Sequence, residues 1–301
     1  MTLKDRVAIV TGSGGGLGRS HVRYLARMGA RVVVNDLSQE AANGVAAEIE
    51  GAGGEAMAIA GSVTDERAVA AMLDRVVDEW GRVDILVNNA GILRDKSFGK
   101  MSLEDFRLVI EVHLIGAVIC TKAVWDLMRE QRYGRIVMTT SSSGLYGNFG
   151  QTNYGAAKMA LVGLTQTLAI EGEKYNIRVN CLAPTAATQM TEGVLSPESL
   201  RVLDPARVSP GLLALVSEDA PTRAILCAGA GNFATANVTL TQGYYAGTGE
   251  NAGEEVIAHW REVSDRTGEI VPNYGFTQAE REVARAGLTA PVVEVQPRPL
   301  T

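Results

Sequence analysis

Short β-rich runs alternate with longer helical patterns over roughly the first 230 residues of the chain. The first run, Val7–Thr11, is uninterrupted apolar and β-branched sequence, which is typical of a parallel strand covered on both faces. Similar runs follow at Arg31–Asn35, Ala56–Ala60, Asp84–Asn88, Arg135–Thr140, Ile177–Leu182 and Ala224–Cys227. This alternation predicts an α/β fold, a Rossmann-type doubly wound parallel sheet with right-handed connections.

Composition indicates one large domain with an appendage. The 301 residues are 46% hydrophobic and 21% charged, which is ordinary globular usage, and no Pro/Gly-rich linker interrupts the alternating region. After about Ala228 the chain is rich in Gly, Thr and Asn, and helical patterns follow at Glu254–Arg266 and Thr277–Ala286. We expect a Rossmann-type domain over residues 1–253 and a helical C-terminal appendage with an extended tail over residues 254–301.

Charge and cysteine usage exclude several classes of function. With 28 Lys and Arg against 34 Asp and Glu, the net charge is −6, and no basic block favours nucleic acid or an anionic membrane. Three distant cysteines form neither a disulfide framework nor a zinc spacing. An apolar strand pattern begins within six residues, and no apolar run reaches the ~18 residues of a membrane span. We expect a cytoplasmic protein without a metal site.

A glycine-rich turn lies between the first strand and the first helical pattern. The segment TGSGGGLG contains Gly12, Gly16 and Gly18, with Leu17 beginning the helical pattern. Glycines allow a tight turn and let backbone N–H groups approach a pyrophosphate at the positive end of a helix. A plain βα turn is the alternative interpretation, but this position in the fold favours a dinucleotide site.

Two further features support that site. Asp36 ends the second strand about 20 residues after the glycines, where a carboxylate accepts hydrogen bonds from the adenosine ribose hydroxyls. A 2′-phosphate would meet a negative charge without a basic neighbour there, so the sequence favours NAD over NADP. Asp36 is also placed to cap the next helix. The turn of Asn89, Ala90 and Gly91 closes the fourth strand on the adenine and ribose side.

A tyrosine and a lysine form the candidate chemical end of the site. Tyr154 and Lys158 are four residues apart and share a helix face. A neighbouring ammonium favours the phenolate and would draw the pKa of Tyr154 from near 10 toward the working pH, so that it can exchange a proton with an alcohol. Ser141 ends a strand and can hydrogen-bond the reacting oxygen. An ordinary surface pair is the alternative interpretation, but the serine-rich strand end and the glycine turn favour a catalytic role for this pair.

Taken in order, these motifs resemble the short-chain dehydrogenase/reductase family across at least residues 5–230. TGSGGGLG, NNAG, a serine thirteen positions before YGAAK, and NCLAP stand at the family's spacing. The segments NNAGILRDKSF and YGRIVMTTSSSGLYGNFGQTNYGAAK are similar to the (3R)-hydroxyacyl-CoA dehydrogenase module of peroxisomal multifunctional enzyme type 2 and its stand-alone bacterial relatives.

The resemblance implies a role for each matching residue. Tyr154 would be the catalytic acid/base, Lys158 its pKa-lowering partner and a ribose ligand, and Ser141 the donor to the substrate oxygen. The implied NAD contacts are Gly12, Gly16, Leu17, Gly18, Asp36, Ser62, Val63, Asn89, Ala90, Gly91, Tyr154 and Lys158.

Three positions depart from the wider family. His113 stands where the family has an asparagine next to a proton-relay water, and it either replaces that relay or is an ordinary helix histidine. Ser62 replaces an aspartate that commonly faces adenine, with Val63 still available to pack on the ring. Thr185 replaces the glycine that usually follows NCLAP.

The remaining features concern substrate and assembly. Residues 184–220 correspond to the family's substrate loop, in which Met190 and Leu195 would line an acyl pocket or simply pack. Arg94, Lys96 and Lys100 would meet CoA phosphates or be solvated surface charges. Two helical segments, 104–131 and 153–173, are apolar on more than one face, and the resemblance implies that they form the interface of a homodimer or homotetramer.

The expected function is NAD-dependent oxidation of a secondary alcohol to a ketone. The substrate implied is a (3R)-3-hydroxyacyl-CoA, oxidised to the 3-oxoacyl-CoA in lipid metabolism, with either a fatty or a steroid side-chain acyl group. A hydroxysteroid dehydrogenase acting on ring alcohols is the enzymatic alternative. A non-catalytic NAD-binding regulator is the alternative from another class, and the joint presence of Ser141, Tyr154 and Lys158 argues against it.

Overall fold

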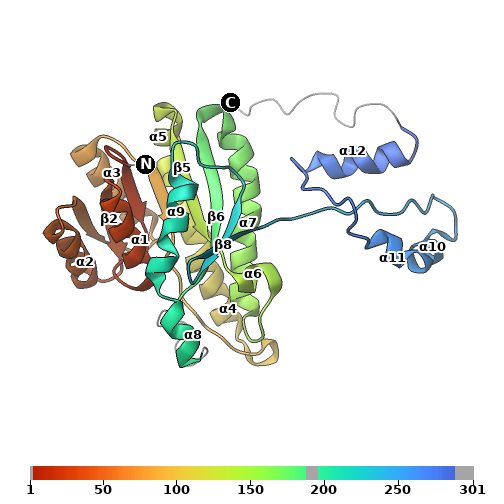
Figure 1. The fold of residues 1–301 in the computed structure, drawn as a ribbon, viewed down its shortest axis with the longest axis horizontal. Coiled ribbons are helices and arrows are strands. Elements are labelled where there is room, and N and C mark those ends of the chain that lie inside the picture. Colours follow the sequence, from red (N-terminus) through yellow and green to blue (C-terminus); the bar gives the residue numbers. More distant parts are fainter. Residues whose placement is uncertain (1–2, 188–195, 289–301) are drawn as a thin grey trace. The chain divides into compact units, whose positions relative to one another are not determined.

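An eight-stranded sheet in the order β3-β2-β1-β4-β5-β6-β7-β8 organises the protein in a computed structural model, which describes residues 3–187 and 196–288 (Figure 1). Its strands are β1 Val7–Val10, β2 Arg31–Asp36, β3 Ala56–Ala60, β4 Ile85–Asn88, β5 Gly134–Thr139, β6 Ile177–Thr185, β7 Ile225–Gly229 and β8 Asn232–Ala236. Strands β1 to β7 are parallel, which confirms the Rossmann-type fold. Strand β8 runs antiparallel to β7.

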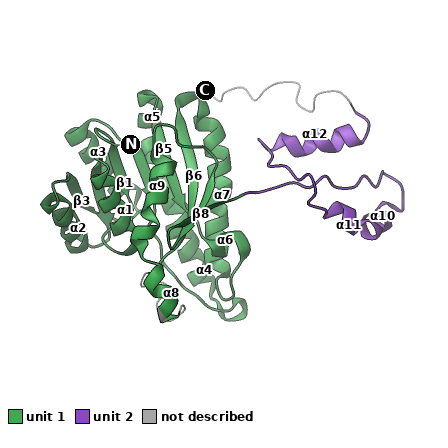
Figure 2. Ribbon diagram, in the orientation of Figure 1, with its two compact units in different colours: residues 1–236 green, residues 237–301 purple. Residues whose placement is uncertain are grey.

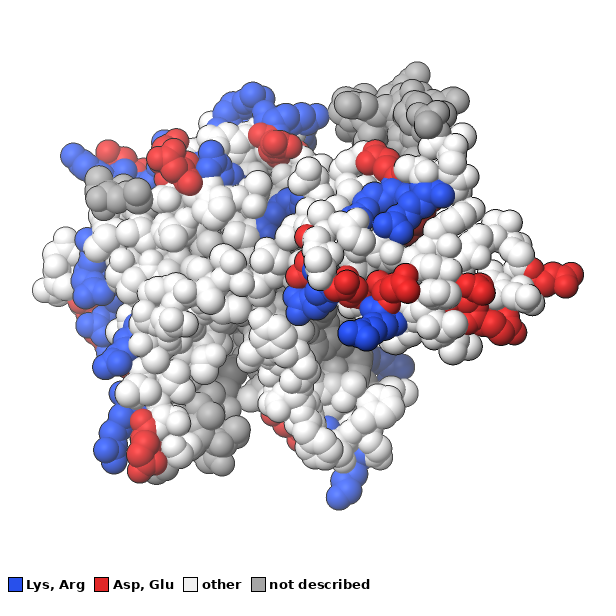
Figure 3. Space-filling view, turned by 45° about the vertical axis from the view of Figure 1, so that its right-hand side comes forward, with Lys and Arg blue, Asp and Glu red and all other residues white. Residues whose placement is uncertain are grey.

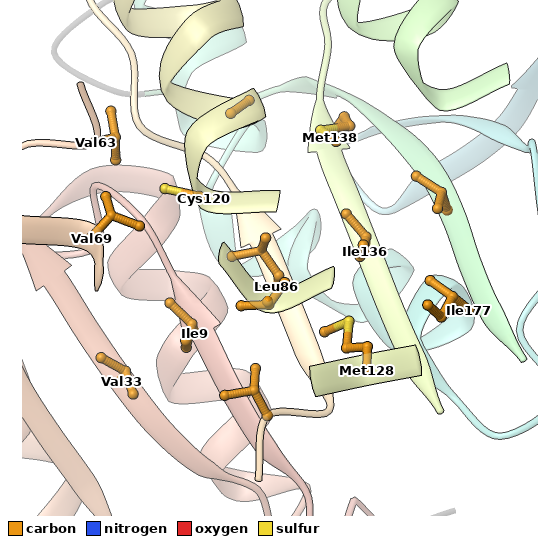
Figure 4. Packing of buried hydrophobic residues seen from close by; sticks show 14 of the residues in the cluster. Ile9, Val33, Val63, Val69, Leu86, Cys120, Met128, Ile136, Met138 and Ile177 are labelled. Carbon is orange, nitrogen blue, oxygen red and sulfur yellow. The ribbon is translucent and has the colours of Figure 1, made fainter. Parts of the chain in front are cut away.

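Helices cover both faces of the sheet, and each face has its own hydrophobic core. One face packs under α1 (Gly16–Arg27), α2 (Gln39–Gly51) and α9 (Ser209–Val216). The other packs under α3 (Glu66–Trp80), α5 (Gly116–Gln131) and α7 (Thr152–Gly172). Figure 4 shows this second core, where side chains of the sheet and of α3 and α5 interdigitate. Burial on both faces explains why the strands read as continuous apolar runs.

Local sequence signals set several helix boundaries. The Ser38 side chain accepts a hydrogen bond from Ala41 N (3.2 Å) at the start of α2, and Asp65 caps α3 in the same way through Arg67 N (2.9 Å). Helix α3 ends at Gly81, whose φ of 72° is left-handed. The caps of α2 and α3 lie at the carboxyl edge of the sheet, where the loops after β2 and β3 end, whereas Gly81 lies at the amino edge before β4.

A single long helix, Leu103–Gln131, connects β4 to β5, and one of its turns is π-helical. It comprises α4 (Leu103–Ile110), a π-helical turn (Glu111–Ile115) and α5. By length and composition this 29-residue helix would be able to cross a membrane. Its inner face instead contributes Cys120, Val124 and Met128 to the core cluster of the sheet. We therefore interpret it as a core helix.

The described chain divides into two compact units, residues 1–236 and 237–301 (Figure 2). The division lies earlier than the boundary at Gly253 expected from the sequence. The reason is that the Gly/Thr/Asn-rich segment pairs with the C-terminal helices: Leu240 bridges Ile270, and the Tyr244 ring stacks on His259 at 4.1 Å. Unit 2 contains α10 (Ala252–Ala258), α11 (Trp260–Val263) and α12 (Phe276–Arg285). None of its described residues, 237–288, is buried.

Candidate active site

The glycine turn after β1 is closely packed against the turn after β4. Gly12 has a left-handed φ of 61°, and a Cβ there would lie 2.8 Å from Ala90 Cα. A Cβ on Gly18 would lie 2.3 Å from the Gly12 carbonyl oxygen. Gly16, with a φ of 51°, begins α1. Glycine is therefore required here by geometry, and the turn leaves the start of α1 open for a pyrophosphate.

The Asn89 side chain stabilises this glycine turn by hydrogen bonds. Its side-chain amide donates to the carbonyl oxygens of Thr11 (2.9 Å) and Gly12 (3.0 Å). The Thr11 hydroxyl in turn accepts hydrogen bonds from Asn89 N and Ala90 N, each at 3.0 Å. Asn89, expected as a cofactor contact, thus has a structural task in addition, because it fixes the shape of the glycine turn.

Asp36 lies directly against the glycine turn. One carboxylate oxygen accepts a hydrogen bond from Gly14 N (3.0 Å), and the other accepts one from Ser38 N (3.2 Å). A Cβ on Gly14 would lie 2.8 Å from the Asp36 carboxyl carbon. These contacts fix the carboxylate at the mouth of the turn while it keeps acceptor capacity, so the residues present fit the adenosine ribose of a dinucleotide.

The other expected adenine contacts follow β3. Ser62 exchanges a hydrogen bond with the Thr64 hydroxyl at 2.9 Å. Val63 is buried in the core, and a Cβ on Gly116 would lie 2.6 Å from one of its methyl groups. Gly116 therefore permits close contact between the β3 loop and the start of α5.

Ser141, Tyr154 and Lys158 come together at the carboxyl end of β5. Ser141 caps the short helix α6 (Ser142–Tyr146), and its hydroxyl hydrogen-bonds the Tyr154 phenol. Lys158 Nζ lies 5.4 Å from the centre of the Tyr154 ring and donates to the Thr139 carbonyl oxygen at 2.5 Å. A phenol, a hydroxyl and a buried amine therefore meet at the strand end, where ligands bind in such sheets.

The electrostatics differ from the sequence expectation. Burial raises the pKa of Tyr154 above its usual value, although the hydrogen bond with Ser141 opposes that rise. Burial also lowers the pKa of Lys158 from 10.5 to about 7. The expectation that Lys158 draws the pKa of Tyr154 down is therefore wrong for the protein by itself. The reason is that burial is the largest cause of both shifts, since it disfavours the phenolate of Tyr154 and the ammonium of Lys158.

His113 lies within the π-helical turn, next to Tyr154. Its ring is 5.2 Å from the Tyr154 ring in an edge-on arrangement, and its Nε2 pairs with the Ile92 backbone (2.8 Å to the oxygen). Burial lowers the pKa of His113 to about 3, so the ring is neutral. Gly91 makes room for it, because a Cβ there would lie 2.2 Å from the ring.

A small cavity adjoins this histidine. Its lining includes His113, Asn88 and Lys158, and its volume of about 10 Å³ is close to what one water molecule requires. Among the described residues, His113 Nδ1, Asn88 Oδ1 and Thr139 Oγ1 are buried without a hydrogen-bond partner. The sequence pointed to Asn88 only as part of the NNAG turn, on the adenine and ribose side, and it did not point to Thr139. Only their position at two adjacent strand ends signals a role.

The substrate side is described in part. The candidate acyl-pocket residues Met190 and Leu195 lie outside the described residues, whereas the rest of the loop includes α8 (Pro197–Val202). Lys96 is ion-paired with Asp105 at 3.0 Å, and Arg94 lies 3.9 Å from the same carboxylate. On the face drawn in Figure 3, Lys and Arg are interspersed with Asp and Glu and form no continuous basic surface.

Comparison with known proteins agrees with this geometry. Residues 6–198 match the short chain dehydrogenase family. A short-chain type dehydrogenase/reductase of Mycobacterium tuberculosis is 45% identical over 90% of this chain and 98% of its own length. The peroxisomal hydratase-dehydrogenase-epimerase of Saccharomyces cerevisiae is 43% identical over 88% of this chain, which spans only 31% of that protein.

Two solved structures are similar in fold. Full-length peroxisomal multifunctional enzyme type 2 of Drosophila melanogaster has a TM-score of 0.81 and 36% identity, covering 95% of this chain and 50% of that one. A 7α-hydroxysteroid dehydrogenase complexed with NADH and 7-oxo glycochenodeoxycholic acid has a TM-score of 0.71 and 33% identity, covering 77% and 95%. With the glycine turn and the Ser141, Tyr154 and Lys158 group in place, the chain belongs to the short-chain dehydrogenase/reductase family, whose members are oxidoreductases that use a nicotinamide cofactor.

Proposed function

We propose that this protein is an NAD-dependent dehydrogenase that oxidises a (3R)-3-hydroxyacyl-CoA to the 3-oxoacyl-CoA. The observation that carries the chemistry is the meeting of Ser141, Tyr154 and Lys158 at the end of β5. The substrate class is supported by the similarity to the yeast hydratase-dehydrogenase-epimerase and to multifunctional enzyme type 2. Since this chain spans only part of those proteins, their other activities are not transferred to it.

Each residue has a separate task in the proposed reaction. The Ser141 hydroxyl donates a hydrogen bond to the substrate oxygen and fixes it beside the Tyr154 phenol. Tyr154 accepts the proton of the secondary hydroxyl group. Bound NAD supplies the hydride acceptor and a positively charged ring, which favours the phenolate of Tyr154. Lys158, in its protonated form, stabilises the negative charge on the reacting oxygen atoms.

His113 and Asn88 provide a route for the proton away from Tyr154. Both side chains and Lys158 line the one-water cavity, and His113 Nδ1 and Asn88 Oδ1 lack partners among the described residues. A neutral imidazole can orient a water as donor or acceptor, depending on its tautomer. We therefore propose a relay through this cavity, with His113 as a positioning residue.

Asp36 supports the preference for NAD. Its carboxylate is fixed by Gly14 and Ser38 at the mouth of the glycine turn. A 2′-phosphate on the adenosine ribose would place two negative charges together there. The NADH bound to the similar hydroxysteroid dehydrogenase is in line with this preference. A cytoplasmic homodimer or homotetramer remains a prediction from the sequence.

The second candidate is oxidation of a hydroxysteroid, which the similarity to 7α-hydroxysteroid dehydrogenase favours. NADH formation distinguishes the two when the enzyme is offered (3R)- and (3S)-hydroxyacyl-CoA, of short and long chain, beside a ring-hydroxylated steroid. The proposal expects turnover of the (3R) thioesters with NAD and little with NADP. Turnover of the steroid alone would assign the second candidate, and equal use of NADP would contradict the role of Asp36.

A further inference from the structure

Exposed aromatic side chains gather on two loops beside the catalytic residues. Phe98 follows β4, and Tyr146 and Phe149 follow β5; their side chains are 73%, 71% and 90% exposed. These two strands are neighbours, so both loops lie at the carboxyl edge of the sheet, where ligands bind. We call these three side chains the aromatic ledge. Isolated exposed apolar residues are common, but several on adjoining loops mark a binding surface.

Hydrogen bonds hold the two loops together. Lys96 N donates to the Gly150 carbonyl oxygen (2.9 Å), and Gln151 Nε2 donates to Asp95 Oδ2 (2.6 Å). Gln151 Oε1 accepts from the Ser143 hydroxyl at 2.8 Å. In Figure 1 the segment between β4 and α4 accordingly runs beside the segment between α6 and α7. A surface fixed in this way loses little conformational freedom when it binds a ligand.

The aromatic ledge is continuous with the catalytic group. Helix α6 begins at the Ser141 cap and ends at Tyr146, and α7, which carries Tyr154, begins one residue after Gln151. The Tyr146 hydroxyl hydrogen-bonds the Cys227 thiol on β7, which ties this ring to the sheet although 71% of it is exposed. Two of the three side chains of the aromatic ledge, Tyr146 and Phe149, therefore lie in the chain segment that joins Ser141 to Tyr154.

Charge favours an uncharged ligand on this surface. The three rings carry no charge, and two cations that precede Phe98 in the same loop, Lys96 and Arg94, already face Asp105 at 3.0 and 3.9 Å. An alkyl chain gains from contact with aromatic faces and requires no ionic partner. The phosphates of a thioester carrier would gain nothing from the rings.

We infer that the aromatic ledge binds the acyl chain of the substrate beyond its reacting carbon, and that the enzyme prefers long-chain thioesters. This inference rests on the proposed function, because it assigns the chain-length specificity of that same site. Each methylene that an apolar surface removes from water changes binding by roughly fourfold, so contact with a few methylenes produces a large chain-length effect.

The test is the double variant Phe98→Ser/Phe149→Ser. We expect kcat/KM for a sixteen-carbon (3R)-hydroxyacyl-CoA to fall by about tenfold or more, which corresponds to two lost methylene contacts. For the four-carbon thioester it should change by less than about twofold. Leu37→Ser is the matched control, because Leu37 is 76% exposed on the loop after β2, and it should leave the ratio of the two values unchanged.

An unchanged ratio of long-chain to short-chain kcat/KM in the double variant would overturn the inference. If a smaller assembly in sedimentation accompanied that unchanged ratio, the aromatic ledge would be assigned to a subunit contact. Calorimetry with palmitoyl-CoA and acetyl-CoA decides independently of turnover: the wild-type protein should bind palmitoyl-CoA more tightly, and the double variant should lose that difference. If the wild-type protein oxidises neither thioester, the proposed function fails while this binding result still decides the inference.

Discussion

The two ends of strand β5 differ in how many hydrogen-bond partners their buried polar side chains have. At the amino end, Arg135 is fully buried and donates to the carbonyl oxygens of Ser217, Glu218, Gly134 and Asn176 at 2.8–2.9 Å. Its guanidinium also lies 4.1 Å from the centre of the Tyr133 ring. At the carboxyl end, Lys158 Nζ donates a hydrogen bond to the Thr139 carbonyl oxygen at 2.5 Å, and its described neighbours include polar atoms without a hydrogen-bond partner.

This difference gives the amino end of β5 a stabilising role and the carboxyl end a chemical role. A buried cation with four of its five donors in hydrogen bonds fixes the structure around it, since removing it takes a donor from each of those carbonyl groups. A buried amine with few partners has a lowered pKa, and an unpartnered donor or acceptor can still bind substrate or water. The comparison teaches that the carboxyl end retains bonding capacity at a cost in stability, whereas the amino end uses most of it.

The largest expected effect is on turnover at the carboxyl end. Tyr154→Phe removes the proton acceptor but keeps the ring beside His113, so kcat should fall by about a thousandfold or more. NADH formation measures this effect. The NAD dissociation constant and the melting temperature, as controls, should stay close to those of the wild-type protein. Substantial residual turnover would assign the proton transfer to another group.

The next largest effect concerns stability at the amino end. Arg135→Met removes the guanidinium donor from four backbone carbonyl groups, of which those of Ser217 and Asn176 keep a second backbone donor, so the free energy of unfolding should fall by about 2–4 kcal/mol. Urea denaturation measures the change. Arg129→Met is the matched control, because Arg129 is partly exposed on α5 and should cost well under half as much. If Arg135→Met were neutral, the amino end would not have the stabilising role assigned to it.

The sequence could predict the features of this comparison that depend on local geometry, but not those that depend on burial or on distant contacts. The glycine turn, Asp36 and the Y-x-x-x-K spacing depend on local geometry, and the sequence placed them correctly in the sheet. Burial is a property of the whole fold, so the sequence suggested a lowered pKa for Tyr154 where desolvation raises it. Three of the four carbonyl partners of Arg135, those of Asn176, Ser217 and Glu218, also lie far away in the sequence, and nothing local signals them.

Other elements escaped prediction for related reasons. The residues of β8, NFATA, are mostly exposed and lie in a glycine-rich region, so their composition gives little strand signal. The π-helical turn that places His113 adds one residue to a helical turn without changing the apolar pattern around it. The boundary at Ala236 depends on contacts such as the Leu240–Ile270 bridge, which only the folded chain reveals.

Replacing the buried cation at the carboxyl end by Met should change the free energy of unfolding in the opposite direction from Arg135→Met. Lys158→Met removes a buried amine whose folded pKa, about 7, lies below its ordinary value of 10.5. The desolvation cost is present in full below pH 7 and is lost as pH rises toward 10.5, because the unfolded chain then holds the proton and the folded chain does not. After allowing for the lost bond to Thr139, the variant should be about 1–3 kcal/mol more stable at pH 7.

Denaturation of the two proteins at pH 7 and pH 10 checks this sign. The stability gain of Lys158→Met should shrink at pH 10, while its turnover is lost at both values. A variant that is less stable than the wild-type protein at pH 7 would contradict the comparison, since it would mean that Lys158 is as well satisfied as Arg135.

The smallest expected effect tests the unpartnered atoms themselves. His113→Leu removes Nδ1 from the cavity, which Asn88 Oδ1 and Lys158 continue to line, so kcat should fall by about tenfold with little change in KM. His113→Asn keeps an amide at the same position and should restore most of kcat. The solvent isotope effect on kcat separates relay from packing: it should increase in His113→Leu and return toward the wild-type value in His113→Asn. Equal losses of kcat in both variants, without a change in the isotope effect, would show that His113 acts only by supporting the Ile92 backbone.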